Sequence, residues 1–138
     1  CDILGYLHRK SPPVIHRDFS PDNLILDNTG VLKLTDFNIA LQLEADCNKR
    51  VAGKHAYIPP EQFRGEASPQ SDIYAFGCTL HFLLTAQDPE ALSVSSPKDL
   101  NAGTSEALDR IVRKCTEQSR ASRYQSMNEI KSDLIACE

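Results

Sequence analysis

The sequence predicts a mainly helical α+β domain with one small β-hairpin. Apolar residues recur at helical spacing near the N-terminus and through residues 69–137, which predicts helices there. Two short apolar runs, 24–26 and 31–34, flank a strong turn and predict the hairpin. With 138 residues, 41% of them hydrophobic, the chain can bury one core of ordinary size, so we expect one domain or part of one.

Residues 1–10 are expected to form the last turns of a helix. Ile3, Leu4 and Leu7 lie at helical spacing, and the proline-containing run 11–13 ends the pattern. Because the sequence starts abruptly and without Met, we expect it to be part of a longer protein.

The next segment predicts an antiparallel hairpin, because the turn sequence Asp-Asn-Thr-Gly at 27–30 separates the two apolar runs. Asn23 stands at the entrance of the first strand and Asp36 at the exit of the second. Antiparallel pairing should therefore bring Asp36 back beside Asn23, although the two residues are thirteen positions apart.

Residues 38–65 show no sustained period and predict one long loop, which in a compact domain usually has a function. A helix should follow, with Ser68 as its N-cap and Pro69 in its first turn. Its apolar positions surround nearly the whole helix, so we expect it at the centre of the core. They are Ile73, Phe76, Gly77, Leu80, Leu83 and Leu84.

The C-terminal third predicts a loop and two amphipathic helices. Residues 86–103 are rich in Pro, Ser, Asp and Gly, which is typical of a loop with at most a short helix. The helices are expected at about 104–117 and 127–137, and Ser126 with Glu129 forms a capping box before the second.

Charge, cysteine usage and the length of the apolar runs indicate which partners and which compartment to expect. The net charge is −4 and Lys and Arg form no cluster along one face, so we expect no nucleic-acid partner. The five cysteines are an odd number with no Cys-x-x-Cys pair, which is typical of reduced thiols and predicts a cytoplasmic protein. Without a signal peptide or a membrane-length apolar run, no membrane contact is expected in this segment; a tether elsewhere stays open.

Two carboxylates and an amide follow His16 and Arg17 along the chain: Asp18, Asn23 and Asp36. Transfer of a phosphoryl group to a hydroxyl needs a base near the acceptor and oxygen ligands for Mg²⁺. A hairpin that gathers these three side chains would supply both.

Four motifs extend this pattern in order along nearly the whole chain. They are His16-Arg17-Asp18 with Asn23, Asp36-Phe37-Asn38, Pro59-Pro60-Glu61 and Ser71-Asp72-Ile73-Tyr74-Ala75-Phe76-Gly77. Together they resemble the C-terminal lobe of a protein kinase, and the wording of 58–63 and 70–74 is similar to bacterial eukaryotic-like Ser/Thr kinases.

The resemblance implies the helical C-terminal lobe of the kinase fold, with a small β-hairpin beside the catalytic loop and with the N-terminal lobe absent. It divides the chain into a catalytic loop at 14–23, an activation segment at 36–61 and a helical subdomain at 69–138. Since the Gly-rich loop and the ATP-anchoring Lys would precede residue 1, the isolated chain is expected to bind ATP poorly and to turn over little.

By the same resemblance, Asp18 is the catalytic base, and Asn23 and Asp36 ligate Mg²⁺ on the phosphates of ATP. Ile25 would form the floor under adenine while also belonging to the core. The implied cofactors are ATP and Mg²⁺, and the implied substrate is a protein with Ser or Thr.

Other family positions imply structural contacts. Glu61 should form a buried ion pair with Arg123, and Asp72 should hold the backbone of the loop around His16. His16 and Phe37 should stack beneath the site, so His16 is assigned no proton transfer.

Three departures from the family pattern bear on the mechanism. Ser20 stands where Ser/Thr kinases usually have a Lys, and Lys54 stands where they have a Thr. We expect the two residues to have exchanged roles, with Lys54 supplying the cation at the transferring phosphate; the alternative is a solvated lysine. Asn38 replaces a Gly, and Asn tolerates the left-handed backbone that this position requires.

The third departure concerns activation. No Ser or Thr occurs between Asp36 and Glu61, so activation by phosphorylating such a residue is not expected in this segment. Glu44 or Asp46 would then offer Arg17 a permanent negative partner; a solvated Arg17 is the alternative.

The favoured interpretation is an ATP- and Mg²⁺-dependent Ser/Thr protein kinase, with activity residing in the intact domain. One alternative is a pseudokinase acting as a regulatory binding module, if the changes at Ser20 and Asn38 abolish transfer. The other is a small-molecule phosphotransferase of the aminoglycoside type. The peptide-docking loop at 59–61, with its ion-pair partner Arg123, argues against the second alternative.

Overall fold

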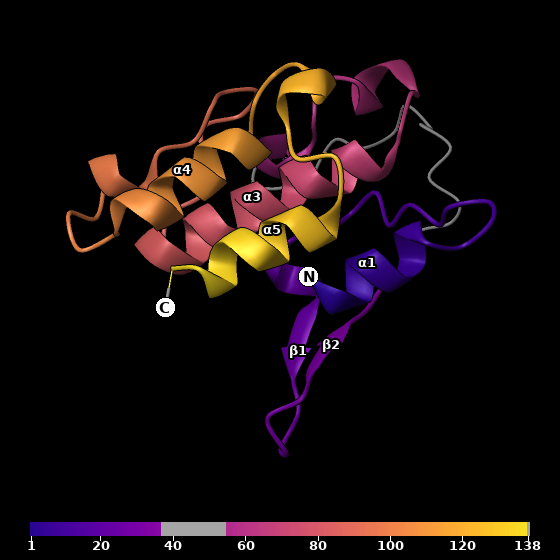
Figure 1. The fold of residues 1–138 in the computed structure, drawn as a ribbon, viewed down its shortest axis with the longest axis horizontal. Helices are drawn as coiled ribbons and strands as arrows, with labels where there is room; N and C mark the ends of the chain where they lie inside the picture. The colour runs from indigo at the N-terminus through magenta and orange to yellow at the C-terminus, as the bar shows by residue number, and fades with distance from the viewer. Residues whose placement is uncertain (37–54, 138) are drawn as a thin grey trace.

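The computed structural model describes residues 1–36 and 55–137, which form a helical body with one hairpin (Figure 1). The helices are α1 (Asp2–His8), α3 (Pro69–Thr85), α4 (Glu106–Cys115) and α5 (Met127–Ile135). The strands are β1 (Leu24–Leu26) and β2 (Leu32–Leu34). Single 3₁₀ turns are η1 (Pro21–Asn23), η2 (His55–Tyr57), η3 (Gln62–Arg64), η4 (Pro97–Asp99) and η5 (Arg120–Ser122). The predicted α+β, mainly helical class is confirmed.

The hairpin has the predicted antiparallel register, with Leu24 opposite Leu34 and Leu26 opposite Leu32. Its second strand begins one residue later than expected, because Val31 belongs to the turn. The N–H of Val31 donates to the Asp27 carboxylate at 3.0 Å, and the N–H of Asp27 donates to the Val31 carbonyl at 3.0 Å. The hairpin extends away from the helices in Figure 1.

Helix α3 lies at the centre of the core over residues 71–79, as its apolar sequence predicts, whereas Leu83 near its end is 64% exposed. Ile73, Tyr74 and Cys78 are fully buried although they lie on different sides of the helix. Helix α4 packs closely on α3, because a side-chain carbon added at Gly77 would lie only 2.5 Å from Cβ of Cys115. A glycine at this position therefore permits the close contact between the two helices.

Helices α4 and α5 are shorter than the sequence predicts, and local hydrogen bonds explain where each begins. Ser105 caps α4 by accepting the N–H of Leu108 at 3.2 Å, so residue 104 stays outside the helix. Ser126 caps α5 by accepting the N–H of Glu129 at 3.3 Å, which is one half of the predicted capping box. The Glu129 carboxylate accepts the N–H of Gln125 at 3.2 Å and not that of Ser126. None of the helices in the described ranges combines the length and the apolar character that a membrane crossing needs.

His81, a residue of α3, has 4% of its surface exposed, and neither ring nitrogen has a hydrogen-bond partner in the described part of the chain. Burial lowers the pKa of His81 below its ordinary 6.5, and the nearby Asp109 carboxylate opposes this only in part. The folded state therefore resists taking up a proton that the unfolded chain accepts.

This pKa shift predicts a stability that depends on pH. Below pH about 6.5 the unfolded chain binds the His81 proton and the folded state does not, so the free energy of unfolding should decrease as the pH falls from 7.5 to 5.5. Urea unfolding of wild type and His81→Gln at both pH values measures the effect. The variant should lose less stability than wild type over this interval, and equal losses would contradict the assignment.

Candidate active site

Asp72 of α3 fixes the loop that carries the candidate base. Its fully buried carboxylate accepts the backbone N–H groups of His16 and Arg17, both at 2.9 Å. This contact confirms the role predicted for Asp72. The loop backbone is unusual at Arg17, whose φ of 69° is costly for a residue other than Gly. Gln62 adds support by donating from Nε2 to the Arg17 carbonyl at 2.8 Å.

A second histidine binds the same carboxylate. His8, in the last turn of α1, lies with Nε2 2.8 Å from Oδ2 of Asp72, and its side chain is mostly buried. The role of His8 was not predicted, because nothing in the helical pattern around it indicates a partner that lies 64 positions away. The contact ties α1 to the central helix, next to the loop that Asp72 also holds.

The structure brings Asp18 and Asn23 together. The turn η1 reverses the chain after Ser20, so that Nδ2 of Asn23 donates to the Asp18 carbonyl at 2.6 Å and to its carboxylate at 3.1 Å. Asn23 is 3% exposed, whereas Asp18 is only partly buried. Because the amide nitrogen of Asn23 donates hydrogen bonds to Asp18, the amide oxygen of Asn23 is the atom that can bind a cation.

The hairpin also returns the chain from Asp36 to Asn23. The N–H of Thr35 donates to the Asn23 carbonyl at 2.9 Å, and the Thr35 carbonyl lies 3.1 Å from Nε2 of His16. Asp36 follows directly, with an exposed side chain and a left-handed φ of 53°. The backbone of Asp36 thus lies at the entrance of the hairpin, beside the loop that carries Asp18.

The donor set fits Mg²⁺, which is usually held by one or two protein oxygens together with phosphate oxygens and water. Asn23 and Asp36 would supply those protein oxygens. Within residues 1–36 and 55–137, no three side chains of His, Cys, Asp or Glu cluster closely enough to hold a metal without such help. The arrangement therefore fits a cation that arrives with a phosphate ligand.

The other predicted site residues that the structure describes, Ser20 and Ile25, differ in burial. Ser20 is 2% exposed, and its hydroxyl has no hydrogen-bond partner among the described residues. Ile25 is 50% exposed on β1, so the expectation that it belongs to the core is wrong. The hairpin extends away from the helices and leaves Ile25 and the 67% exposed Leu26 as an uncovered apolar surface. Lys54 lies outside the described residues. The same is true of the expectations for Phe37, Asn38, Glu44 and Asp46.

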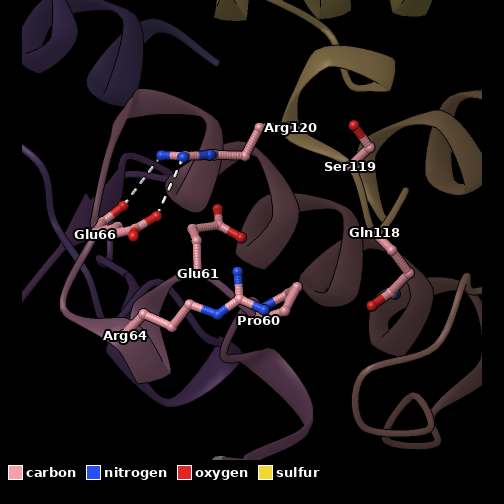
Figure 2. Close-up of a pocket in the computed structure, with 7 residues that line it drawn as sticks. All are labelled: Pro60, Glu61, Arg64, Glu66, Gln118, Ser119 and Arg120. Atoms are coloured by element: carbon pink, nitrogen blue, oxygen red, sulfur yellow. Dashed lines mark hydrogen bonds and ion pairs between the residues drawn. The ribbon is translucent and has the colours of Figure 1, made fainter.

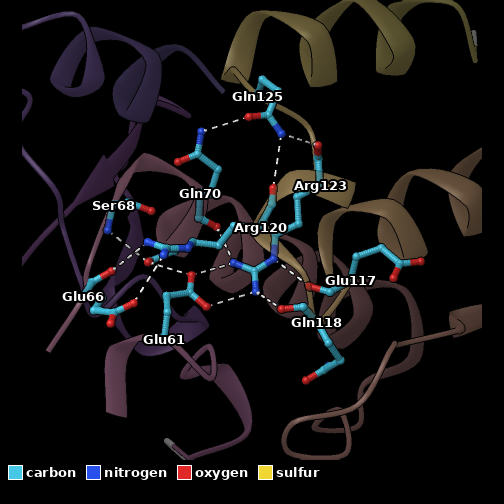
Figure 3. Close-up of polar contacts among 10 residues, drawn as sticks. Glu61, Glu66, Ser68, Gln70, Glu117, Gln118, Arg120, Arg123 and Gln125 are labelled. Atoms are coloured by element: carbon cyan, nitrogen blue, oxygen red, sulfur yellow. Dashed lines mark hydrogen bonds and ion pairs between the residues drawn. The ribbon is translucent and has the colours of Figure 1, made fainter. Parts of the chain in front are cut away.

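The predicted ion pair between Glu61 and Arg123 is confirmed (Figure 3). Nη1 and Nη2 of Arg123 donate to the Glu61 carboxylate at 2.6 and 3.1 Å, and both side chains are buried. The remaining N–H groups of Arg123 donate to the carbonyls of Gln70, Glu117 and Gln118. All five donors of the guanidinium are therefore used.

The pKa of Glu61 follows from this geometry. Burial alone would raise the pKa of the carboxyl group, but the hydrogen bonds from Arg123 and Ser71 outweigh it and hold the pKa below its ordinary value. Ser71 contributes by donating from its hydroxyl at 2.8 Å. Glu61 therefore stays ionised in the fold.

A loop fixed by Asp72, an Asp18–Asn23 contact and a hairpin that returns Asp36 form the arrangement that the protein kinase resemblance implies. The protein kinase domain model matches residues 1–137, and the chain belongs to this family. Among its relatives, the serine/threonine-protein kinase PknB of Mycobacterium leprae is 32% identical over 98% of this chain and 24% of its own length. PrkC of Bacillus subtilis, also a serine/threonine-protein kinase, is 32% identical over 96% of this chain and 23% of its own length.

These relatives identify the sequence as that of a bacterial eukaryotic-like kinase. A probable PknB of Bifidobacterium longum matches similarly, at 32% identity over 97% of this chain. The chain spans about a quarter of the length of the curated relatives that it matches.

Proposed function

We propose that the chain forms the helical C-terminal lobe of a Ser/Thr protein kinase, which transfers the γ-phosphoryl group of ATP to a protein hydroxyl. The observation that carries the proposal is the Asp18–Asn23 contact on a loop held by Asp72, beside the returning Asp36. The names of the bacterial relatives support Ser and Thr as acceptors.

Each residue then has a defined task. The Asp18 carboxylate orients the acceptor hydroxyl and takes its proton as the oxygen bonds to phosphorus, and ADP leaves. Asn23 restrains that carboxylate through its amide nitrogen and, with Asp36, would hold Mg²⁺ through oxygen. Bound Mg²⁺ supplies positive charge at the ATP phosphates. Ile25 would lie against the adenine through its exposed side chain.

Reduced cysteines support a cytoplasmic location for this reaction. Within the described residues, Cys1, Cys78, Cys115 and Cys137 are all free thiols. Such thiols persist in a reducing compartment, where ATP is also abundant.

The acceptor class separates this proposal from its alternatives. The full-length protein should transfer labelled phosphate from ATP to a general protein acceptor such as casein, and not to an aminoglycoside. Transfer to the aminoglycoside alone would indicate a small-molecule phosphotransferase. If no acceptor is labelled while ATP still binds, the protein is a pseudokinase.

The proposed exchange of roles between Ser20 and Lys54 has its own test. The buried Ser20 hydroxyl, which has no partner in the described ranges, supports an interaction from another part of the chain. Lys54→Thr in the full-length protein should lower kcat by at least about tenfold, because a cation at the transferring phosphate acts mainly in the transition state. The dissociation constant of ATP should change much less, and an unchanged kcat would refute the exchange.

A further inference from the structure

A hollow of about 330 Å³ lies between the loop after Pro60 and the connection from α4 to α5 (Figure 2). Arg64 and Arg120 lie on opposite sides of the Glu61 carboxylate in this view, and Gln118 and Ser119 lie across from Glu66. None of the residues that line the hollow belongs to the proposed catalytic site. An inference about this hollow is therefore independent of the proposed kinase activity.

Both carboxylates of the hollow already have a cationic partner. Glu61 at its base pairs with the buried Arg123, whose donors are all used. Glu66 at its edge accepts Nη2 of Arg120 at 3.2 Å, and Nη1 of Arg120 lies 3.4 Å from the Glu66 carbonyl. Neither carboxylate therefore needs a further cation.

Arg64 is different, because its exposed guanidinium has no hydrogen bond or ion pair with any residue that the structure describes. Its side chain extends along the hollow towards Pro60 in Figure 2. The hollow thus has one unmatched positive charge. The Ser119 hydroxyl adds a neutral donor on the opposite side, where Gln118 also lines the hollow.

We propose that this hollow binds the carboxylate of a small acidic ligand. A guanidinium offers two parallel N–H groups that match a planar carboxylate. A single negative charge balances Arg64, whereas the second charge of a phosphate monoester would lie near Glu66 and be repelled. The volume is at the small end for ligand pockets, which suits an acidic amino-acid side chain or a small organic acid.

The experiment uses the full-length protein and monitors the side-chain N–H signals of arginine by NMR during titration. The probes are blocked aspartate (N-acetyl-aspartate amide), propionate and blocked asparagine as the uncharged control. Blocked aspartate should shift the signals of Arg64, and blocked asparagine should not. Tighter binding of blocked aspartate than of propionate identifies a peptide source, and equal binding identifies a small organic acid.

Arg64→Gln should weaken the binding of blocked aspartate by about tenfold, because it removes the charged donor. Arg110→Gln removes an equally exposed arginine from the surface of α4 and should leave the affinity within about twofold. Equal affinities of Arg64→Gln and wild type would overturn the proposal, as would equal binding of blocked asparagine.

A second variant changes the net charge of the hollow and leaves Arg64 in place. Glu66→Gln frees Arg120 from its partner and gives the hollow a second unmatched charge. Wild type should prefer blocked aspartate to phosphoserine, and Glu66→Gln should reverse this preference. A wild-type protein that prefers phosphoserine would overturn the carboxylate assignment.

Discussion

Replacing Asp18 by Asn in the full-length protein is expected to lower the rate of phosphoryl transfer by a factor of about 10² to 10⁴. The amide cannot accept the proton of the acceptor hydroxyl, although it can keep a contact like the one that Asn23 makes with Asp18. The affinity for ATP should stay within about threefold, because Asp18 acts on the acceptor and not on the nucleotide. Initial rates with labelled ATP and a protein acceptor measure the change.

Asp22→Asn is the matched control for this prediction. Asp22 lies in the same turn as Asn23, four residues after Asp18, and its side chain is exposed. Its replacement removes the same charge from the same loop and should leave the rate within about threefold. If the two variants lose equal activity, the effect is one of net charge and Asp18 is not the base.

Replacing Arg123 by Met should destabilise the fold by about 3 to 5 kcal/mol, because it leaves the buried Glu61 carboxylate without its cation. Three backbone carbonyls also lose a donor, and one of them belongs to Gln70 in the first turn of α3. Urea unfolding measures the change in the free energy of unfolding. Arg113→Met, on the exposed surface of α4, should change stability by less than about 0.5 kcal/mol.

The double variant Glu61→Gln with Arg123→Met separates the unpaired charge from lost packing. Removing the negative charge as well should recover part of the stability that Arg123→Met loses. If the single and double variants are equally unstable, the loss comes from packing and from the free carbonyls, and the ion pair contributes nothing.

Local sequence determines most of the elements, which is why their order could be predicted. The turn residues at 27–30 and the apolar runs beside them produce the hairpin in its expected register. The all-round apolar pattern of α3 places this helix at the centre. The ends of the helices and strands were predicted less accurately. Local hydrogen bonds at residues such as Val31 and Ser105 fix these ends, and the spacing of apolar residues does not report such bonds.

Contacts between distant segments were predicted only where the family resemblance named both partners. The Glu61–Arg123 pair and the hold of Asp72 on the catalytic loop are of this kind. His8 binds the same Asp72 but was missed, since its partner depends on how α1 packs against α3. The hollow beside Arg64 was missed for the same reason, because its walls come from segments more than fifty positions apart.

In the candidate site, contacts between nearby residues were predictable from the sequence, whereas the chemical roles of several residues stay untested. The short spacing between Asp18 and Asn23 made their contact predictable, and pairing in the hairpin predicted the return of Asp36. The roles of Ser20 and Lys54 at the transferring phosphate, and of Ile25 under the adenine, remain predictions.

The proposed activity depends on Asn23 and Asp36 holding one divalent cation beside Asp18. Mn²⁺ prefers the same oxygen ligands as Mg²⁺ and can be counted by electron paramagnetic resonance. The measurement is the affinity of Mn²⁺ for the full-length protein with a non-hydrolysable ATP analogue, in wild type and in single alanine variants.

Asn23→Ala and Asp36→Ala should each weaken Mn²⁺ binding by at least about tenfold. Asn28→Ala, which removes an exposed amide from the turn of the same hairpin, should not weaken it. Wild-type affinity in both site variants would show that these two residues do not hold the cation.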